Sequence, residues 1–332
     1  MCEIGRQDRI PKGFLVYTLN EYGHMLADNI RVRAYREALA RVIRPGSVVV
    51  EIGTGVGYFA LAAASLGAKR VYAFELTPSI HIAANVLEKN GNRVIQLIRA
   101  HSTKVALTEQ ADVLFSDLRG SVPAFADHFA SIIDARRRFL APGGALIPQR
   151  DQVWGALVES PAVYYRNVEV WRSVETEYDL SSAILAQTST PAKCRFKATE
   201  LLSDEQLWMT FEYSDIVLQS FTSVLTFRAR RSGMCHGLAL WFETELWDGI
   251  GYTNHPSRPP MIYGQTLFPF SHPLQLKKDE SVTCELSALI LDGLYVWRWK
   301  TTTSSQQFDQ SNEALPEVFE ARQRAGSETV AN

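Results

Sequence analysis

Three closely spaced glycines give this chain its clearest chemical signal. Gly53, Gly55 and Gly57 follow the apolar run 48–50, and an alanine-rich run at 59–64 comes next. An apolar β-branched run, a glycine turn and a helix-forming run, in that order, are typical of the entry to a nucleotide-type cofactor site. Glycines let the backbone approach a ligand, and a helix N-terminus offers unpaired N–H groups. A tight turn that binds nothing is the alternative.

Two carboxylates accompany the glycine turn. Glu51 lies two residues before the first glycine, and Glu75 ends the run 71–75, about twenty residues after Gly55. At that spacing a carboxylate accepts hydrogen bonds from ribose hydroxyls. A dinucleotide site uses G-x-G-x-x-G, whose last glycine is here Tyr58. The spacing G-x-G-x-G instead resembles motif I of class I S-adenosylmethionine (SAM) methyltransferases. We therefore expect SAM as the cofactor and S-adenosylhomocysteine as its product.

Bulk composition excludes several classes of protein. The 332 residues suffice for two domains, and 46% apolar with 21% charged residues is ordinary for a globular protein. A net charge of −2 gives no reason to expect nucleic acid as a partner. No apolar run approaches a membrane span, and the N-terminus lacks an apolar signal core, so we expect a cytoplasmic protein. The four cysteines are scattered, so we expect no metal site.

The first half of the chain alternates between strand and helix patterns. Residues 1–45 form a helical segment expected to cover the cofactor, with one amphipathic helix that ends at Pro45. Residues 46–150 are expected to form a Rossmann-like α/β domain with a parallel sheet. Its predicted strands are 47–52, 70–75, 93–98 and 112–116, its predicted helices are 58–66, 78–89 and 127–139, and one more strand follows the turn at 140–148.

The second half has the pattern of an antiparallel domain. Short alternating runs separated by turns within 151–310 predict a β-barrel-like domain. The insertion at 160–200 is long for a compact sheet domain and predicts a functional arm. Residues 311–332 read as a polar tail with a short helix near 317–322. The predicted strands of this half are 153–158, 221–227, 237–246, 265–270, 281–291 and 294–299, with helical character near 168–171 and 178–185.

Six motifs in one order resemble the protein arginine methyltransferases over about residues 24–300. They are the helix motif at 25–38, the glycine turn, Glu75, Leu-Ala-Pro-Gly-Gly at 140–144, Tyr-Asp-Leu-Ser at 178–181 and Gly-Leu-Ala-Leu-Trp-Phe at 237–242. The resemblance implies a SAM-binding Rossmann-like domain, a β-barrel-like domain, and a helical arm that packs on a second subunit to give a homodimer.

The same resemblance completes the expected cofactor site. In that family the counterpart of Arg31 holds the SAM carboxylate, for which a guanidinium gives a bidentate grip. Ser102 stands where the family usually has an acid that contacts the adenine amino group. The expected cofactor-binding residues are Arg31, Glu51, Gly53, Thr54, Gly55, Gly57, Glu75, Leu76, His101, Ser102 and Asp117.

The substrate side departs from the family pattern. The family holds a guanidinium with two glutamates, the first in Ser-Glu-Trp-Met-Gly and the second nine residues later. Here these positions are Asp117 and Ala126, and Arg119 adds a positive charge that repels a guanidinium. The family's Thr-His-Trp loop becomes Met261–Tyr263, without the histidine. This pattern predicts that the methyl group goes to an acceptor other than a protein arginine.

Three functions stay open at this point. The first is a small-molecule methyltransferase, with an indole C3-methyltransferase as the sharpest guess, because bacterial relatives of the fold that lack the glutamate pair include such enzymes. The second is a protein arginine methyltransferase that uses Asp117 and Asp127. The third is a non-catalytic SAM-binding dimer. The expected catalytic residues are Asp117, His24 and Asp127, with His128 taken as an ordinary surface histidine, and the expected substrate-binding residues are Tyr17, Tyr22, Met25, Arg119 and Tyr263.

Overall fold

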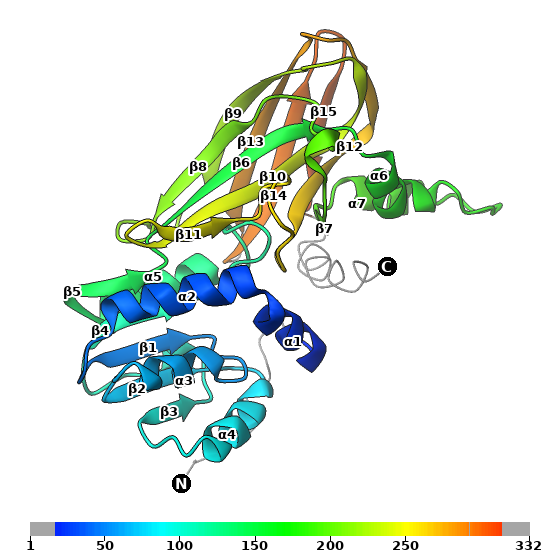
Figure 1. The fold of residues 1–332 in the computed structure, drawn as a ribbon. Coiled ribbons are helices and arrows are strands. Elements are labelled where there is room, and N and C mark those ends of the chain that lie inside the picture. The colour runs from blue at the N-terminus through cyan, green and yellow to red at the C-terminus, as the bar shows by residue number, and fades with distance from the viewer. Residues whose placement is uncertain (1–16, 292, 314–332) are drawn as a thin grey trace.

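The computed structural model describes residues 17–313 except residue 292, and Figure 1 shows their arrangement. A parallel sheet with its helices forms one half, and two antiparallel sheets form the other. Residues 1–16 of the predicted N-terminal segment and the predicted helix near 317–322 lie outside the described residues. Within the described part of the chain, no helix is long and apolar enough to cross a membrane.

The first half has a doubly wound sheet in the strand order β3-β2-β1-β4-β5. All of its neighbouring strands pair in parallel. The order reverses between β1 and β4, and ligands of such sheets bind in the crevice at the carboxyl ends of these strands. The strands are β1 (Val48–Ile52), β2 (Arg70–Phe74), β3 (Ile95–Ile98), β4 (Ala111–Ser116) and β5 (Leu140–Ile147). The helices are α3 (Tyr58–Ser65), α4 (Ser79–Lys89), the short 3-10 turn η1 (Ser102–Lys104) and α5 (His128–Arg138).

The N-terminal segment differs from the prediction of one helix. It forms α1 (Leu19–Ala27) and α2 (Asn29–Val42), separated at Asp28. The Asp28 carboxylate accepts a hydrogen bond from the N–H of Arg31 at 3.1 Å, which caps α2. Its other oxygen accepts from the N–H of Ile262 at 2.8 Å. The periodicity of apolar residues does not reveal this break, because both helices turn apolar residues toward the protein interior. The cap fixes where α2 begins and therefore where Arg31 lies on it.

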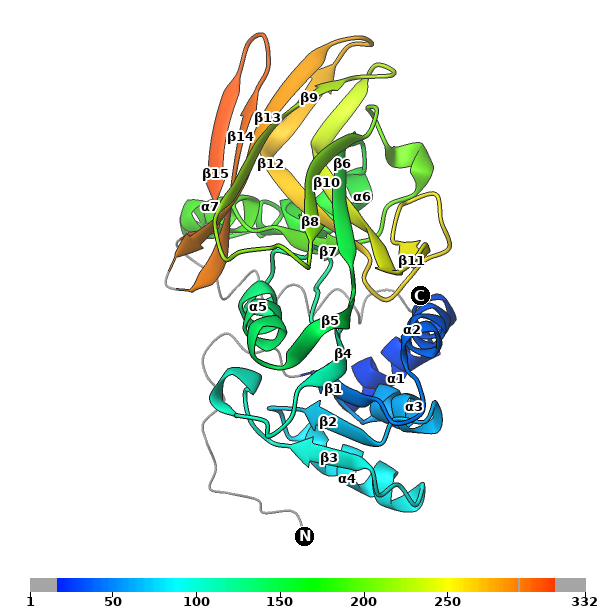
Figure 2. The same cartoon turned by 90° about the vertical axis from the view of Figure 1, so that its left-hand side faces the viewer.

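The second half consists of a six-stranded and a four-stranded antiparallel sheet. The first has the order β7-β12-β10-β6-β8 with β11 paired to β10, and the second has the order β15-β14-β13-β9. Figure 2 shows the chain running from β5 directly into β6. The strands are β6 (Arg150–Val158), β7 (Ala192–Cys194), β8 (Gln206–Glu212), β9 (Phe221–Arg228), β10 (Gly233–Trp247), β11 (Ile250–Thr253), β12 (Gln265–Leu276), β13 (Ser281–Leu291), β14 (Leu294–Thr302) and β15 (Gln307–Ser311).

A helical arm projects from the side of the antiparallel half (Figure 1). It contains α6 (Pro161–Asn167), η2 (Glu169–Trp171) and α7 (Ser181–Thr188), and the short η3 (Ala198–Glu200) follows β7. The arm carries large apolar side chains that are exposed, among them Tyr178 at 72% and Leu185 at 66%. An apolar surface of this kind is typical of a protein–protein contact.

Candidate functional site

Two adjoining cavities lie where the parallel sheet meets α1, α2 and the antiparallel half. The larger has an empty volume of about 1250 Å³ and the smaller one of about 570 Å³. The residues that line both cavities, and so form their shared wall, are Tyr17, Met25, Arg31, Asp117 and Phe125. A ligand in the larger cavity would therefore contact a ligand in the smaller one at this wall.

The glycine turn forms the floor of the larger cavity. Gly53, Gly55 and Gly57 have φ angles of +82°, +57° and +84°, which favour glycine. A Cβ on Gly55 would stand 2.6 Å from Cε1 of Tyr22, so the position also needs the small residue for space. The Glu75 carboxylate accepts the N–H of Gly55 and the N–H of Thr77, each at 2.8 Å. The turn and the acid thus form one rigid unit at the carboxyl end of the sheet.

Glu51 is buried in the same cavity. The hydroxyl of Thr54 donates to its carboxylate at 2.6 Å. Burial raises the pKa of Glu51 to about 7, and nearby Glu75 acts in the same direction. A cationic ligand group beside Glu51, such as a sulfonium or an ammonium, would favour the ionised form of its carboxyl group.

The far end of the larger cavity carries a polar set. His101 and Asp127 hydrogen bond at 2.7 Å, and the hydroxyl of Ser131 donates to the same Asp127 oxygen at 2.8 Å. Burial opposes ionisation of Asp127, but these hydrogen bonds lower its pKa overall. The buried Ser102 hydroxyl has no hydrogen-bond partner among the described residues. An unpartnered buried hydroxyl on a cavity wall fits a polar ligand such as an adenine ring.

Asp117 occupies the shared wall between two guanidinium groups. Its carboxylate accepts from Nε of Arg31 at 2.5 Å and from the hydroxyl of Tyr263 at 2.6 Å. Nη2 of Arg119 lies 3.4 Å from its other oxygen. Burial opposes the charge, yet the two arginines hold the pKa of Asp117 below its usual range. Its negative charge is therefore compensated within the protein.

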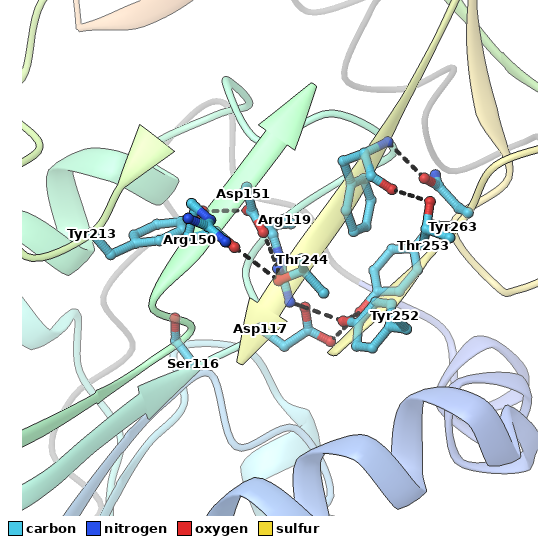
Figure 3. Close-up of polar contacts among 12 residues, drawn as sticks. Ser116, Asp117, Arg119, Arg150, Asp151, Tyr213, Thr244, Tyr252, Thr253 and Tyr263 are labelled. Carbon is cyan, nitrogen blue, oxygen red and sulfur yellow. Dashed lines mark hydrogen bonds and ion pairs between the residues drawn. The ribbon is translucent and has the colours of Figure 1, made fainter. Parts of the chain in front are cut away.

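Arg119 connects the loop after β4 to the antiparallel half (Figure 3). Its fully enclosed side chain pairs with Asp151 of β6 at 2.6 Å. It also donates to Thr244 of β10 at 2.5 Å and to Tyr252 of β11 at 2.9 Å. Asp151 in turn accepts from the hydroxyl of Tyr213 at 2.6 Å. Arg119 was predicted to bind substrate; the structure gives it a buried structural pairing at the edge of the smaller cavity.

The other predicted residues separate into four groups, according to which of the two cavities they line. Tyr17 and Met25 line both cavities, and Tyr263 lines the smaller one. Tyr22, Leu76 and Asp127 line the larger cavity and lie outside the wall of the smaller. His24 is exposed on α1 and lines neither cavity, so its predicted catalytic role has no geometric support. His128 was read as a surface residue, and this was wrong: it is buried and bonds to Tyr213 at 2.8 Å.

Sequence reasoning missed several residues of the smaller cavity. Glu21, Lys193 and Ile262 line it from α1, β7 and the loop before β12. They come from segments far apart in the chain, and only the pairing of β7 with β12 brings Lys193 here. The charged residues at 193, 195 and 197 were a possible signal, but Arg195 and Lys197 are exposed and only Lys193 lines the cavity.

The strand order, the glycine turn at its switch point and the acids at the carboxyl ends of β1 and β2 define a class I SAM-dependent methyltransferase. Arg31, Glu51, Glu75 and the orphan hydroxyl of Ser102 fit the carboxylate, sulfonium, ribose and adenine groups of SAM in kind. Among the described residues, no cluster of His, Cys, Asp and Glu could hold a metal ion.

Comparisons with known proteins agree with this class. The model of the arginine methyltransferase oligomerization subdomain matches residues 149–290, and that of the TRM5/TYW2 methyltransferase domain matches residues 28–138. An arginine N(omega)-methyltransferase of Streptomyces achromogenes subsp. streptozoticus is 30% identical over 268 residues, which cover 79% of this chain and 74% of the relative. The probable protein arginine N-methyltransferase 6 of Arabidopsis thaliana is 25% identical, with 81% and 74% covered.

Solved structures share the fold. The Trypanosoma brucei PRMT1 enzyme–prozyme heterotetrameric complex with AdoHcy superposes with a TM-score of 0.78 at 19% identity, over 87% of this chain and 96% of that one. Protein arginine methyltransferase 10 of Arabidopsis thaliana gives 0.74 at 19% identity, over 89% and 97%. The chain belongs to the arginine methyltransferase family. The predicted fold class, SAM as cofactor and methyltransferase activity are thereby confirmed, and the chain carries the family's oligomerization subdomain.

Proposed function

We propose that this enzyme methylates a small-molecule acceptor through an uncharged atom, with an indole or another aromatic ring as the candidate class. The observation that carries the proposal is the charge balance at the shared wall. Asp117 there faces Arg31 and Arg119, and Arg119 is paired with Asp151. Because Asp117 and Asp151 are already paired with these arginines, a guanidinium acceptor would meet carboxylates whose charge is already neutralised.

The second acid of the family pattern has no replacement on this wall. Ala126 occupies its position and lines the larger cavity. The neighbouring Asp127 is bonded to His101 at 2.7 Å and lies outside the smaller cavity. Without a second carboxylate on the shared wall, the site lacks the arrangement that draws the charge of a guanidinium to one end and leaves a lone pair at the other. Glu21 also lines the smaller cavity, but its carboxylate accepts two hydrogen bonds from Thr18.

The lining of the smaller cavity suits a planar ring. Tyr17, Phe125 and Tyr263 contribute aromatic surfaces, and Met25 and Ile262 contribute flexible apolar ones. Aromatic rings stack with offset or edge-to-face geometry, which would orient an indole against the shared wall.

The protein groups would act mainly by alignment. Bound SAM supplies a methyl group on an electrophilic sulfonium. Arg31 would hold the SAM carboxylate, and the aromatic lining would hold the acceptor in line and exclude water. Asp117 is the residue at the wall that could take a proton, but its lowered pKa makes it a weak base. The reaction therefore suits an acceptor whose attacking atom is nucleophilic before proton loss.

Methylation of an arginine group is the second candidate. It is favoured by the names of the relatives, which specify arginine N(omega)-methyltransferase or protein arginine N-methyltransferase. When Arg31 turns to a SAM carboxylate, Asp117 would lose one of its two positive neighbours and could then accept a guanidinium.

Radiolabelled methyl transfer separates the two. The enzyme would be incubated with SAM and, in turn, an arginine-rich peptide, free L-arginine and a set of indole acceptors. The proposal expects labelled product from an indole acceptor and none from the arginine acceptors. Labelling of an arginine acceptor that is abolished by Asp117→Asn would overturn the proposal. Binding of SAM without turnover on any acceptor would support a non-catalytic dimer.

We also propose that the arm at 160–200 joins two copies into a homodimer. The exposed apolar residues of α6 and α7 and the matched oligomerization subdomain support this. We further propose a cytoplasmic location, which cell fractionation tests.

A further inference from the structure

Lys193 is a cation that lines the smaller cavity and has no ion-pair partner among the described residues. It lies on β7, opposite Thr266 of β12, and its side chain lines the smaller cavity. No carboxylate lies within ion-pair distance of it in the described part of the chain, which excludes residues 1–16, 292 and 314–332. Other cations at this site, Arg31 and Arg119, are both paired. Of the three cations that line the smaller cavity in residues 17–313, Lys193 is thus the one without an ion-pair partner.

The environment of Lys193 opposes its charge. Burial and, to a smaller extent, the charge of Arg195 lower its pKa to about 8, and Glu21 acts weakly in the other direction. The Glu21 carboxylate is engaged elsewhere, since it accepts the N–H and the hydroxyl of Thr18 at 2.6 and 2.9 Å. A desolvated ammonium without a partner costs free energy, and a bound anion would remove that cost.

The position of Lys193 fixes which part of an acceptor it would meet. Residues of the shared wall, such as Asp117, line both cavities, whereas Lys193 lines the smaller cavity and not the larger. It therefore lies away from the atom that receives the methyl group. A role as base at that atom does not fit this placement, but a role in holding the other end of the acceptor does.

We propose that Lys193 binds a carboxylate of the acceptor, so that the substrate class is a small aromatic or amino-acid-type acid. The ring or other reacting group lies against the shared wall, and the carboxylate lies at β7. This assignment rests on the proposed small-molecule function and narrows it. An acid of this kind would give Lys193 the ion-pair partner that it lacks among the described residues.

Matched pairs of acids and amides test the assignment. Binding to the enzyme saturated with S-adenosylhomocysteine would be measured by calorimetry for indole-3-propionate against indole-3-propionamide, and for L-arginine against L-argininamide. We expect at least one acid to bind about tenfold more tightly than its amide, because a charge-assisted hydrogen bond is lost in the amide. Lys193→Met should abolish that preference and Lys193→Arg should retain most of it.

Lys197→Met is the control, because Lys197 is exposed on the same segment and lines neither cavity. It should leave the preference unchanged. Three outcomes would overturn the assignment. They are equal binding of acid and amide, no binding of either acid at millimolar concentration, and a preference that survives Lys193→Met. A Lys193-dependent preference seen only with L-arginine would keep the role of Lys193 and count against an indole acceptor. Methyl transfer to a neutral indole, unaffected by Lys193→Met, would keep the proposed function and remove the carboxylate.

Discussion

The buried pair of Arg119 and Asp151 gives the sharpest test of how the two halves are held together. Both side chains are fully enclosed, and their atoms lie 2.6 Å apart. Asp151→Ala would leave Arg119 with Asp117 at 3.4 Å and would leave the Tyr213 hydroxyl without the oxygen to which it donates. Removing one partner of a buried ion pair costs about 3–5 kcal/mol, because the remaining charge stays desolvated. We expect a loss of that size in the free energy of unfolding.

The companion variant is Arg119→Met, which places the family's residue type at this position. It removes the charge from the pair and leaves Asp151 its hydrogen bond from Tyr213. The double variant, Arg119→Met with Asp151→Ala, leaves neither charge in place. The loss of unfolding free energy in the double variant should therefore be smaller than the sum of the two single losses, by about 1–3 kcal/mol.

Urea unfolding followed by circular dichroism measures these losses. Asp309→Ala is the control, because the Arg298–Asp309 pair is at the surface and its removal should cost at most about 1 kcal/mol. Additive losses in the double variant, or a cost of Asp151→Ala no larger than that of the control, would show that Arg119 and Asp151 do not stabilise each other as a buried ion pair.

Four further predictions concern other parts of the molecule. Gly55→Val should abolish SAM binding in calorimetry, because its Cβ would meet Tyr22 at 2.6 Å and its φ is +57°; unchanged affinity would contradict the cofactor site. SAM should bind about tenfold more weakly at pH 6 than at pH 8, since protonation of Glu51 near its pKa of about 7 removes a negative charge beside a cationic ligand, and Glu51→Gln should flatten this dependence. Burial lowers the pKa of His128 to about 3, so only the unfolded state takes up a proton as the pH falls from 6.5 towards 3; thermal stability should fall over that window, and less so in His128→Phe. Leu185→Asp should convert a dimer to a monomer in light scattering with chromatography, whereas Leu207→Asp, an exposed apolar residue outside the arm, should not.

Local patterns were enough to predict the cofactor half of the molecule. The positions of Gly55, Glu51 and Glu75 depend on a strand, a turn and a helix that are adjacent in the chain, so spacing alone reveals them. The break at Asp28 was missed because a capping aspartate between two apolar periods is invisible to periodicity. The short strands β7, β8, β11 and β15 were missed since their residues take strand form only beside partners distant in sequence.

The acceptor side depends on contacts that no local pattern records. Arg119 reads as a charge beside the site, but Asp151 and Thr244, more than thirty and more than one hundred residues away, enclose it. His128 opens a helix and reads as a surface residue, yet Tyr213 and Phe129 cover it. Lys193 reaches the cavity only through the pairing of β7 with β12. Long-range pairing therefore decides the charge of the acceptor cavity.

The identity of the methylated product is the most direct test of which acceptor this enzyme uses. The enzyme would be given radiolabelled SAM and an equimolar mixture of an arginine-rich peptide, L-arginine and indole-3-propionate, and the labelled products would be separated by chromatography. The charge balance at Asp117, Arg31 and Arg119 predicts label on the indole compound alone. Label on the peptide or on L-arginine, lost in Asp117→Asn, would contradict it.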